Sequence, residues 1–293
     1  MEPLIIRGKR IGASELAQIN NTARENWDKG RVFISRRLCE EWNWRQYNGQ
    51  LKDQVCRILL NRLEEKRLIT LPPRKNGSNN AKRRYYVPPD PPPKFPAQAL
   101  DGRIDEFSPI ELRMVRRTPK EALWNYLVYR YHYKSYKIIV GAHVKYMAFI
   151  GDQPVACLAW NSTVFRIQSR DNFIGWDQEA RSKNNRFVIN NSRFLILPWV
   201  RIKNLASHLL GLSAGRISRD WENFYGYPVY LLETFVERER FAGTCYRAAN
   251  WQRVGETKGH AKKNRKFYYH GQIKDVYLYP LVPDFRKRLG GVR

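Results

Sequence analysis

The sequence predicts an α/β protein of the α+β type, in which a small helical domain precedes a larger domain built on a mixed sheet. Two patterns in the 293-residue chain support this prediction. Apolar residues recur with the 3.6-residue period of helices between residues 14 and 63, and they form short alternating runs from residue 143 onward. Six prolines among residues 88–96 separate the two patterns and predict an extended linker. The expected domains are residues 1–87 and 111–293, joined by a linker over 88–110.

Three helices are expected in the N-terminal domain. Polar caps at Ser14 and Ser35 precede two short amphipathic stretches, and a third stretch covers residues 51–63 after the turn at Asn48. Short apolar runs at 68–71 and 84–87 flank a basic turn and predict two strands. Three helices followed by two strands is the element order of a winged helix.

A winged helix binds DNA through its third helix and its wing. The cations that would contact DNA from this domain are Arg45, Lys52, Arg57, Arg83 and Arg84. Such contacts to phosphates position a protein without reading the base sequence. The alternative interpretation is a small helical adaptor whose charged faces are only solvated.

The charge of the chain favours a nucleic-acid partner. Fifty-three Lys and Arg against 27 Asp and Glu give a net charge of +26, and clustered cations gain affinity by releasing counterions from phosphates. No apolar run reaches the roughly 20 residues of a membrane span, and residues 1–10 lack the apolar core of a secretion signal. A cytoplasmic location, DNA as partner and no membrane association are therefore expected. The four cysteines form no C-x-x-C pair and are expected to be free thiols.

The second domain is expected to alternate strands and helices. The pattern predicts a first strand near residues 112–115, a helix from 118 to about 131, and a hairpin around Gly151. The remaining elements are expected to be strands at 187–189 and 194–200, a helix from 205 through 221, a strand at 228–236, a short helix at 243–250 and a strand at 252–257. This order resembles the second half of the GNAT acetyltransferase fold. The glycine-rich pyrophosphate loop of that family is replaced here by residues 201–206, which contain no glycine, so coenzyme A is not expected.

A closer resemblance lies in particular residues spread over most of the chain. These are Trp124-Asn125, Tyr131-His-Tyr133, Arg170-Asp171 with Ile174-Gly-Trp176, the runs 190–201 and 243–251, Leu205-Ala-Ser-His208, Leu232-Glu-Thr-Phe-Val236 and, in the N-terminal domain, the runs 38–44, 51–53 and 68–73. They resemble the DruA-like family, which includes the DruA component of Druantia anti-phage systems and transposase-associated domains. The resemblance implies a DNA transaction in defence or mobile elements, with other defence-system or transposon proteins as further partners.

The chain departs from many relatives after its last predicted strand, where it carries a basic tract over residues 257–265. We expect Lys262, Lys263 and Arg265 in this tract to contact phosphates. The alternative is a solvated charge run.

Two neighbouring residues are candidates for a nucleophile that attacks phosphorus. Cys245 and Tyr246 begin a predicted short helix, where the positive end of the helix dipole favours a thiolate or a phosphate. The acid–base candidates are Glu233, His132 and His208, and the expected phosphate clamps are Arg193, Arg201 and Arg247. For each of these side chains a purely structural role is the competing interpretation.

A metal site is not predicted. Asp171, Asp177 and Glu233 would be the ligands of a two-metal nuclease, but no closely spaced acidic pair supports it, so a role for Mg²⁺ stays open. Tyrosines and cations alternate over residues 129–136 and 266–270, which favours unpaired or distorted DNA.

The function predicted from the sequence is DNA binding, with nicking or transfer of a strand through a covalent Cys or Tyr intermediate. Cutting both strands would require two sites and hence a homodimer. A non-catalytic DNA sensor or recruiter is the alternative, and an acyltransferase is a further one.

Overall fold

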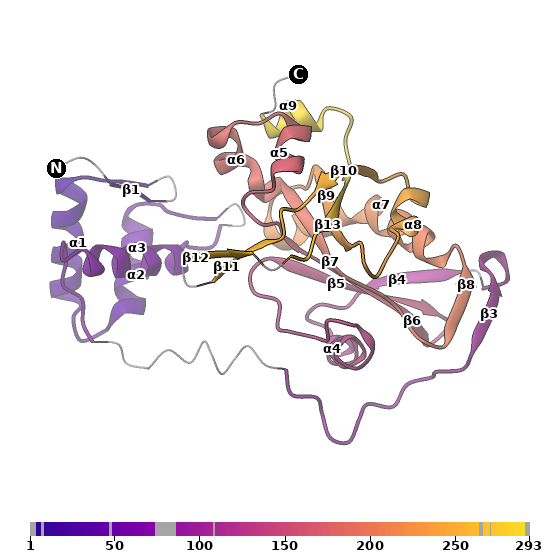
Figure 1. Cartoon of the computed structure of the whole chain (residues 1–293). Helices are drawn as coiled ribbons and strands as arrows, with labels where there is room; N and C mark the ends of the chain where they lie inside the picture. The colour runs from indigo at the N-terminus through magenta and orange to yellow at the C-terminus, as the bar shows by residue number, and fades with distance from the viewer. Residues whose placement is uncertain are drawn as a thin grey trace. The chain divides into compact units, whose positions relative to one another are not determined.

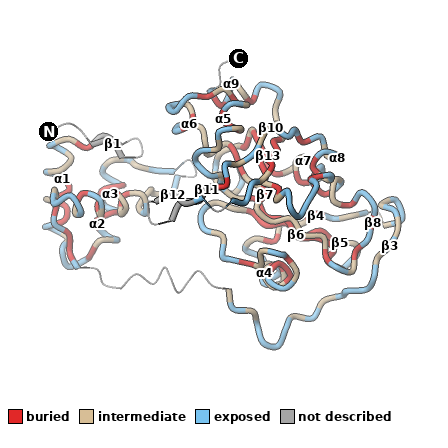
Figure 2. The backbone as a smooth tube through the Cα atoms, viewed as in Figure 1, coloured by how far each residue is buried: buried red, intermediate tan, exposed pale blue. Residues whose placement is uncertain are grey.

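The computed structural model describes residues 4–6, 9–46, 49–73, 86–107, 109–263, 266–269 and 271–290. The chain divides into two compact units, residues 1–82 and 83–293, shown in Figure 1. Figure 2 shows that buried residues line the inner faces of the helices and strands in each unit. Within the described residues, no helix is both long and apolar enough to cross a membrane.

The first unit contains the three helices that the sequence predicts. They follow an antiparallel hairpin and are α1 (Ala13–Glu25), α2 (Arg31–Glu41) and α3 (Asp53–Glu65), the hairpin strands being β1 (Leu4–Ile6) and β2 (Lys9–Ile11). Their apolar faces meet in one core, which includes Ile19, Ile34, Leu38, Leu59 and Leu63. Removing these side chains from water is the main stabilising contribution to a unit of this size.

The wing expected after α3 is not seen in the described residues. Residues 68–71 form no strand, and Ile69 and Leu71 are instead buried in the helical core. The second expected strand includes Arg84, which with Arg83 lies outside the described residues, while Tyr86 and Val87 are not in a strand. The prediction of a strand at 68–71 is therefore wrong, because its apolar residues pack as an extended coil against the helices.

The second unit is built on a seven-stranded mixed sheet with the order β10-β13-β9-β7-β6-β5-β4. All neighbours in it are antiparallel except β7 and β9, which run parallel. Its strands are β4 (Ile110–Met114), β5 (His143–Ile150), β6 (Gln153–Ser162), β7 (Val188–Ile196), β9 (Leu231–Glu237), β10 (Gln252–Glu256) and β13 (Lys274–Pro280). The α/β class with a mixed sheet is thereby confirmed.

Helices cover both faces of this sheet. On β5, Lys145 reaches Glu121 of α4, whereas the next residue, Tyr146, bonds to Asp220 of α7, so α4 and α7 lie on opposite faces. The helices are α4 (Lys120–Tyr131), α5 (Gln168–Ile174), α6 (Gln178–Asn184), α7 (Leu205–Tyr225), α8 (Thr244–Ala248) and α9 (Phe285–Leu289). A separate hairpin joins β11 (His260–Lys263) to β12 (Lys266–Tyr269).

The segment predicted as a linker packs on the second unit along part of its length. The Phe95 ring stacks on Trp199 with centroids 5.5 Å apart, and Gln98 exchanges hydrogen bonds with Gln153. Strand β3 (Leu100–Arg103) then pairs in parallel with β8 (Val200–Lys203). Residues 95–103 of the expected linker therefore pack on the second unit.

Candidate functional site

The parallel strands β7 and β9 pair over only part of their lengths. Their register runs from Val188 opposite Leu231 to Asn191 opposite Thr234. Beyond this point β7 pairs only with β6, and β9 pairs only with β13, so the two strands separate. The end of β9 is therefore free of β7 and opens towards the residues that follow α4.

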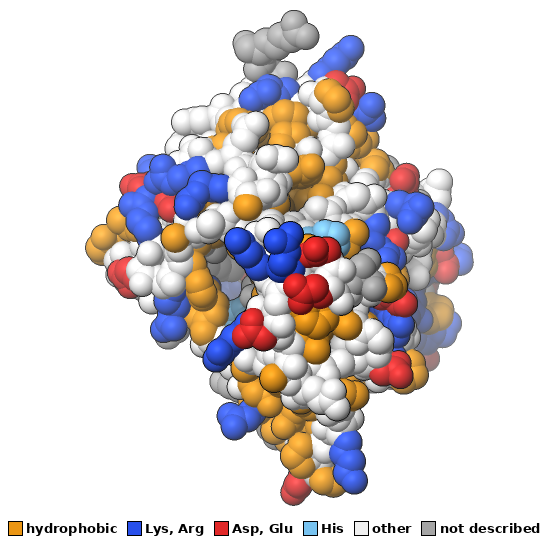
Figure 3. Space-filling view, turned by 90° about the vertical axis from the view of Figure 1, so that its right-hand side faces the viewer, with side chains coloured by type: hydrophobic (Ala, Val, Ile, Leu, Met, Phe, Trp, Pro, Cys, Tyr) orange, Lys and Arg blue, Asp and Glu red, His pale blue; other side chains and the backbone are white. Residues whose placement is uncertain are grey.

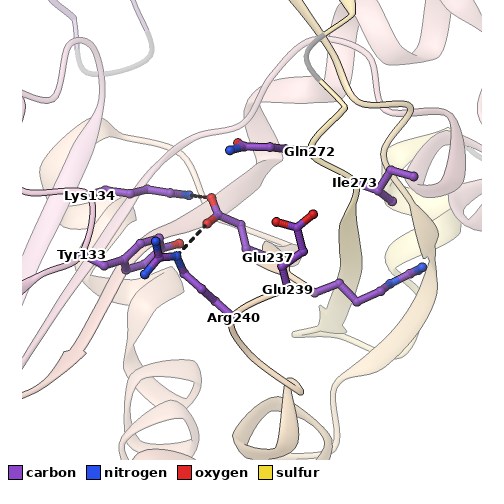
Figure 4. A pocket seen from close by; sticks show the side chains of 8 residues that line it. Tyr133, Lys134, Glu237, Glu239, Arg240, Gln272 and Ile273 are labelled. Atoms are coloured by element: carbon purple, nitrogen blue, oxygen red, sulfur yellow. Dashed lines mark ion pairs between the residues drawn. The ribbon is translucent and has the colours of Figure 1, made fainter.

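A cavity of about 300 Å³ lies at the end of β9. We call it the β9 pocket; it is lined by Tyr133, Lys134, Glu237, Arg238, Glu239, Arg240, Gln272 and Ile273. Figure 4 shows Lys134 and Arg240 on one side of Glu237, with Gln272 and Ile273 across the cavity. The lining comes from three segments that are far apart in the sequence. They follow α4, end β9 and precede β13, respectively.

Glu237 gathers three cations at this pocket. Its carboxylate lies 2.5 Å from the Nζ of Lys134, 3.2 Å from the Nζ of Lys274 and 3.8 Å from the Nε of Arg240. Burial alone would raise the pKa of Glu237, but the hydrogen bonds and charges of Lys134 and Lys274 outweigh it and lower the pKa. Glu239 also lines the pocket, so two carboxylates stand against these three cations, while Arg238 pairs with Asp275 and Glu256. One positive charge is therefore left over at the pocket.

The ring of Tyr133 holds two of these cations in place. The Nζ of Lys134 lies 5.0 Å from the ring centroid and the guanidinium carbon of Arg240 lies 5.1 Å from it. Phe241 packs edge-on against the same ring, with centroids 5.2 Å apart. The cations are thereby positioned before any ligand arrives, which lowers the entropy that binding would cost.

His132 and Arg193 are the predicted site residues that the structure brings close to this pocket. The ring of His132 stacks on Tyr133, and its Nδ1 accepts a hydrogen bond from the backbone N–H of Lys134, which leaves the proton on Nε2. Burial, with the charges of Arg193 and Lys134, lowers the pKa of His132 to about 4. Burial also lowers the pKa of Arg193, whose buried Nε has no partner among the described residues. His132 is thus a neutral donor at pH 7 and not a proton acceptor.

The two predicted nucleophiles are held by the protein. Tyr246 is 7% exposed, and its hydroxyl donates to Asn191 Oδ1 at 2.8 Å and accepts from Thr234 Oγ1 at 3.3 Å, which fills the start of the gap between β7 and β9. Burial raises the pKa of Tyr246 and that of the half-buried Cys245. The start of α8 does not activate the thiol, because desolvation of the thiolate outweighs the backbone hydrogen bonds and the charge of Arg247 that favour it. This arrangement does not support nucleophilic attack by either side chain.

Glu233 belongs to a separate buried network. Its carboxylate lies 3.1 Å from the guanidinium of Arg170, and both side chains are fully buried. Arg170 also pairs with Asp171, which in turn pairs with Arg181. Burial raises the pKa of Glu233 to about 7, although the charge of Arg170 opposes the shift. A carboxylate that balances a buried arginine has a structural role, so an acid–base role at the β9 pocket is not supported.

The other predicted residues lie elsewhere. Arg201 is exposed on β8, His208 is exposed on the first turn of α7, and the guanidinium of Arg247 donates to the carbonyl of Ala242 and to the hydroxyl of Tyr277. In the first unit Arg45 bonds to the carbonyl of Gly49, Lys52 precedes α3 and Arg57 pairs with Asp53. The side chains of Lys262 and Lys263, and all of Arg265, lie outside what the structure describes.

In the described part of the chain, no group of three or more His, Cys, Asp or Glu side chains is arranged to hold a metal ion. Asp171 and Glu233, two of the three carboxylates considered for such a site, are both paired with Arg170. Asp177 instead caps α6, where its carboxylate accepts from the backbone N–H of Ala180 at 2.7 Å. The three carboxylates are therefore not gathered at one site.

The family of this protein follows from its sequence match. Residues 62–265, which are more than half of the chain, match the family model described as Druantia protein DruA. The chain belongs to the DruA family. The match begins in α3 and includes every residue that lines the β9 pocket except Gln272 and Ile273. The comparison with curated proteins finds no match.

Solved structures that resemble this DruA family member include acetyltransferases. An N-acetyltransferase from Staphylococcus aureus is 12% identical, with a TM-score of 0.37 over 59% of this chain and 97% of that one. NAA60 from Arabidopsis thaliana, solved with acetyl-CoA, is 12% identical, with a TM-score of 0.40 over 58% of this chain and 98% of that one. At such identities these matches concern the backbone arrangement alone.

Coenzyme A, the cofactor that the GNAT resemblance implies, does not fit the corresponding residues of this DruA family member. The segment in place of the pyrophosphate loop contains β8, whose residues from Val200 to Lys203 pair with β3. A phosphate-binding loop needs backbone N–H groups that are free and closely approachable, usually at glycines. Here the backbone is used in a strand pair and the segment 197–206 has no glycine.

The residues that form the β9 pocket could be predicted only in part from the sequence. Lys134 and Glu237 stand at the ends of predicted elements, but nothing in the sequence indicated that they meet. The aromatic and cationic run over residues 129–136 was the one signal that marked this region. Arg170 was noted as part of a family motif, and its burial beside Glu233 could not be read from spacing.

Proposed function

We propose that this protein is a DNA-binding component of anti-phage defence that holds DNA by its phosphates at the β9 pocket. The observation that carries the proposal is the cluster of Lys134, Lys274 and Arg240 around the carboxylate of Glu237. Phosphate oxygens accept hydrogen bonds and carry negative charge, so they match the leftover donors and charge of this cluster. The net charge of +26 adds a long-range attraction to any nucleic acid. The DruA family match supports the defence context.

The geometry favours binding over cleavage. Strand cleavage through a covalent intermediate needs an accessible, activated nucleophile, whereas Tyr246 is hydrogen bonded in the interior and the pKa of Cys245 is raised. We therefore place the sensor or recruiter role ahead of nicking and transfer. Other proteins of the defence system would then act on the DNA that this protein holds.

Titration of labelled single-stranded and duplex DNA, followed by fluorescence anisotropy, tests the proposal. The variant Lys134→Ala/Arg240→Ala removes two cations of the pocket and is expected to weaken binding about tenfold or more. The matched control, Lys183→Ala/Arg219→Ala, removes the same residue types from exposed positions on α6 and α7. Equal affinities of the two variants would overturn the proposal.

A further inference from the structure

A second hollow adjoins the β9 pocket. It is a groove of about 680 Å³ between α5 and β10, which we call the α5 groove. Its lining consists of Gln168, Ser169, Asn172, Phe173, Gln252, Arg253, Val254, Glu256, Thr257, Lys258 and Ile273. Ile273 also lines the β9 pocket, so the two hollows are neighbours on one surface. A chain molecule that lies in one of them reaches the other.

Two amide side chains on α5 are hydrogen bonded to each other in this groove. Gln168 Nε2 donates to Asn172 Oδ1 at 2.8 Å, and both residues are exposed. They are one helical turn apart, so their side chains lie on the same face of α5. After this bond, Gln168 Oε1 remains as an acceptor and Asn172 Nδ2 as a donor. If both amides are turned over, the pair still presents one acceptor and one donor.

Such a pair matches the edge of a nucleobase. Adenine, for example, presents an amino donor beside a ring-nitrogen acceptor, and asparagine or glutamine amides recognise this edge. A phosphate presents only acceptors, so it would leave the amide acceptor without a partner. Two amides fixed by each other also lose little rotamer freedom on binding.

Most charges in and beside the α5 groove cancel in ion pairs. Arg253 lies 2.8 Å from Asp275, and Arg238 lies 2.6 Å from both Asp275 and Glu256. These two arginines and two carboxylates balance one another, and Lys258 adds one positive charge to the lining. Polar contact with little net charge is therefore the main chemistry that this groove offers.

Gly255 allows α5 and β10 to approach one another at the base of the groove. It has a φ of +144° at a register shift in β10, and a Cβ built on it would lie 2.8 Å from the Cβ of Ser169. Any other residue would force the helix away. The hydroxyl oxygen of Ser169 is buried there and has no hydrogen-bond partner among the described residues. Ser169 itself lines the groove, with this oxygen below the surface.

We propose that the α5 groove receives an unstacked nucleobase of a DNA strand whose backbone phosphates lie in the β9 pocket. This inference rests on the proposed function and deepens it, because it makes a single strand with exposed bases the preferred ligand. Gln168 and Asn172 would hydrogen bond to the base edge, while the cations around Glu237 hold the neighbouring phosphates. A paired duplex would hide the base edges that these amides read, so it would use the phosphate contacts alone.

Two labelled single strands of equal length separate base contacts from phosphate contacts. One is an oligodeoxyadenylate and the other an abasic deoxyribose-phosphate strand with the same charge. The unaltered protein is expected to bind the adenylate about tenfold more tightly, which is the effect of roughly two net hydrogen bonds. Gln168→Ala/Asn172→Ala should bring this ratio close to one and leave the affinity for the abasic strand unchanged. Gln178→Ala/Asn223→Ala, which removes exposed amides from α6 and α7, should keep the ratio.

The outcomes distinguish this inference from the proposed function. If the unaltered protein binds both strands equally, or if Gln168→Ala/Asn172→Ala keeps the ratio, the nucleobase site is wrong. If at the same time Lys134→Ala/Arg240→Ala still weakens binding to both strands, the β9 pocket binds phosphate although the α5 groove binds no nucleobase. If that pocket variant binds both strands like the unaltered protein, the proposed function itself is wrong. Thermal melting of each variant checks that it is folded.

Discussion

His132 ends α4 with its ring stacked on Tyr133 and its Nδ1 bound to the backbone N–H of Lys134. Burial next to Arg193 lowers its pKa to about 4, well below the ordinary histidine value near 6.5. Between these two pH values, His132 is therefore protonated in the unfolded chain and neutral in the folded chain. The stabilisation from keeping His132 neutral is complete above about pH 6.5 and is lost as the pH falls towards 4.

Replacing the His132 side chain should make the free energy of unfolding depend less on pH between pH 6.5 and 4. His132→Gln keeps an acceptor for the Lys134 N–H and cannot titrate, so we expect about 1–2 kcal/mol less loss of unfolding free energy than in the unaltered protein between pH 6.5 and 4. Urea unfolding at several pH values measures it. Part of the slope should remain, because burial also lowers the pKa of His143 to about 4. An unchanged slope would contradict the neutral, buried state of His132.

Tyr246 shows how a reactive hydroxyl becomes a structural one. Its hydroxyl joins Asn191 of β7 to Thr234 of β9 at the last paired residues of the two strands. Tyr246→Phe leaves the Asn191 amide oxygen without this donor and should lower the unfolding free energy by about 1–2 kcal/mol, with DNA affinity unchanged. Chemical denaturation and anisotropy check the two effects. A DNA adduct that forms with the unaltered protein and is absent in the variant would restore the nucleophile hypothesis.

At the scale of elements, α5 is fixed to the sheet by charge as well as by apolar packing. Arg170 of α5 is fully buried and pairs with Asp171 and with Glu233 of β9, and its remaining donors reach Thr163 and the carbonyls of Val164 and Phe165. Ile174, also on α5, packs in an apolar core with Val188 and Leu231. The position of the α5 groove therefore depends on this arginine.

Breaking the network should destabilise the second unit strongly. Arg170→Met leaves the fully buried carboxylate of Glu233 without its cation and leaves Asp171 with Arg181 alone, so a loss of about 3–5 kcal/mol in unfolding free energy is expected. A smaller effect should follow from Arg219→Met, which removes an exposed arginine from α7. Thermal or urea unfolding of both variants makes the comparison. Similar losses in the two variants would show that Arg170 is not essential to the network.

Elements with a regular apolar period could be predicted from the sequence, and others could not for identifiable reasons. The helical spacing of apolar residues predicts α1, α3 and α7, and the alternation of apolar and polar residues predicts the hairpin of β5 and β6. Strand β13 was missed because Asp275 interrupts its apolar pattern, and only the structure shows that Arg238 and Arg253 neutralise this carboxylate. The runs 187–189 and 194–200, expected as two strands, contribute to one strand, β7, followed by β8.

The candidate site was harder to predict than the fold, because it depends on contacts between distant segments. His132 and Arg193 were named individually, yet Glu237 was not, although it organises the cations of the β9 pocket. Glu233, four residues earlier on the same strand, has the more conspicuous position in an apolar run. Its burial with Arg170 shows that a carboxylate in such a run can balance a hidden arginine. Sequence spacing does not contain that information.

At the scale of the whole molecule, the net charge of +26 favours electrostatic attraction to nucleic acid. On the face shown in Figure 3, Lys and Arg side chains stand in several groups among hydrophobic and acidic ones. Diffuse attraction and a defined phosphate site predict different responses to salt. Only phosphates that are directly neutralised change the slope of log affinity against log salt concentration, whereas loss of a remote cation does not.

The salt dependence of single-strand binding therefore tests where the phosphates lie. Lys134→Ala/Arg240→Ala should reduce the slope by about 1.4, which is two phosphate contacts at roughly 0.7 each. Lys183→Ala/Arg219→Ala changes the net charge equally and should leave the slope as it is. Gln168→Ala/Asn172→Ala should also keep the slope, because a base contact releases no counterion. Equal slopes for the pocket variant and the charge-matched control would mean that the protein binds DNA through its overall charge and not through the β9 pocket.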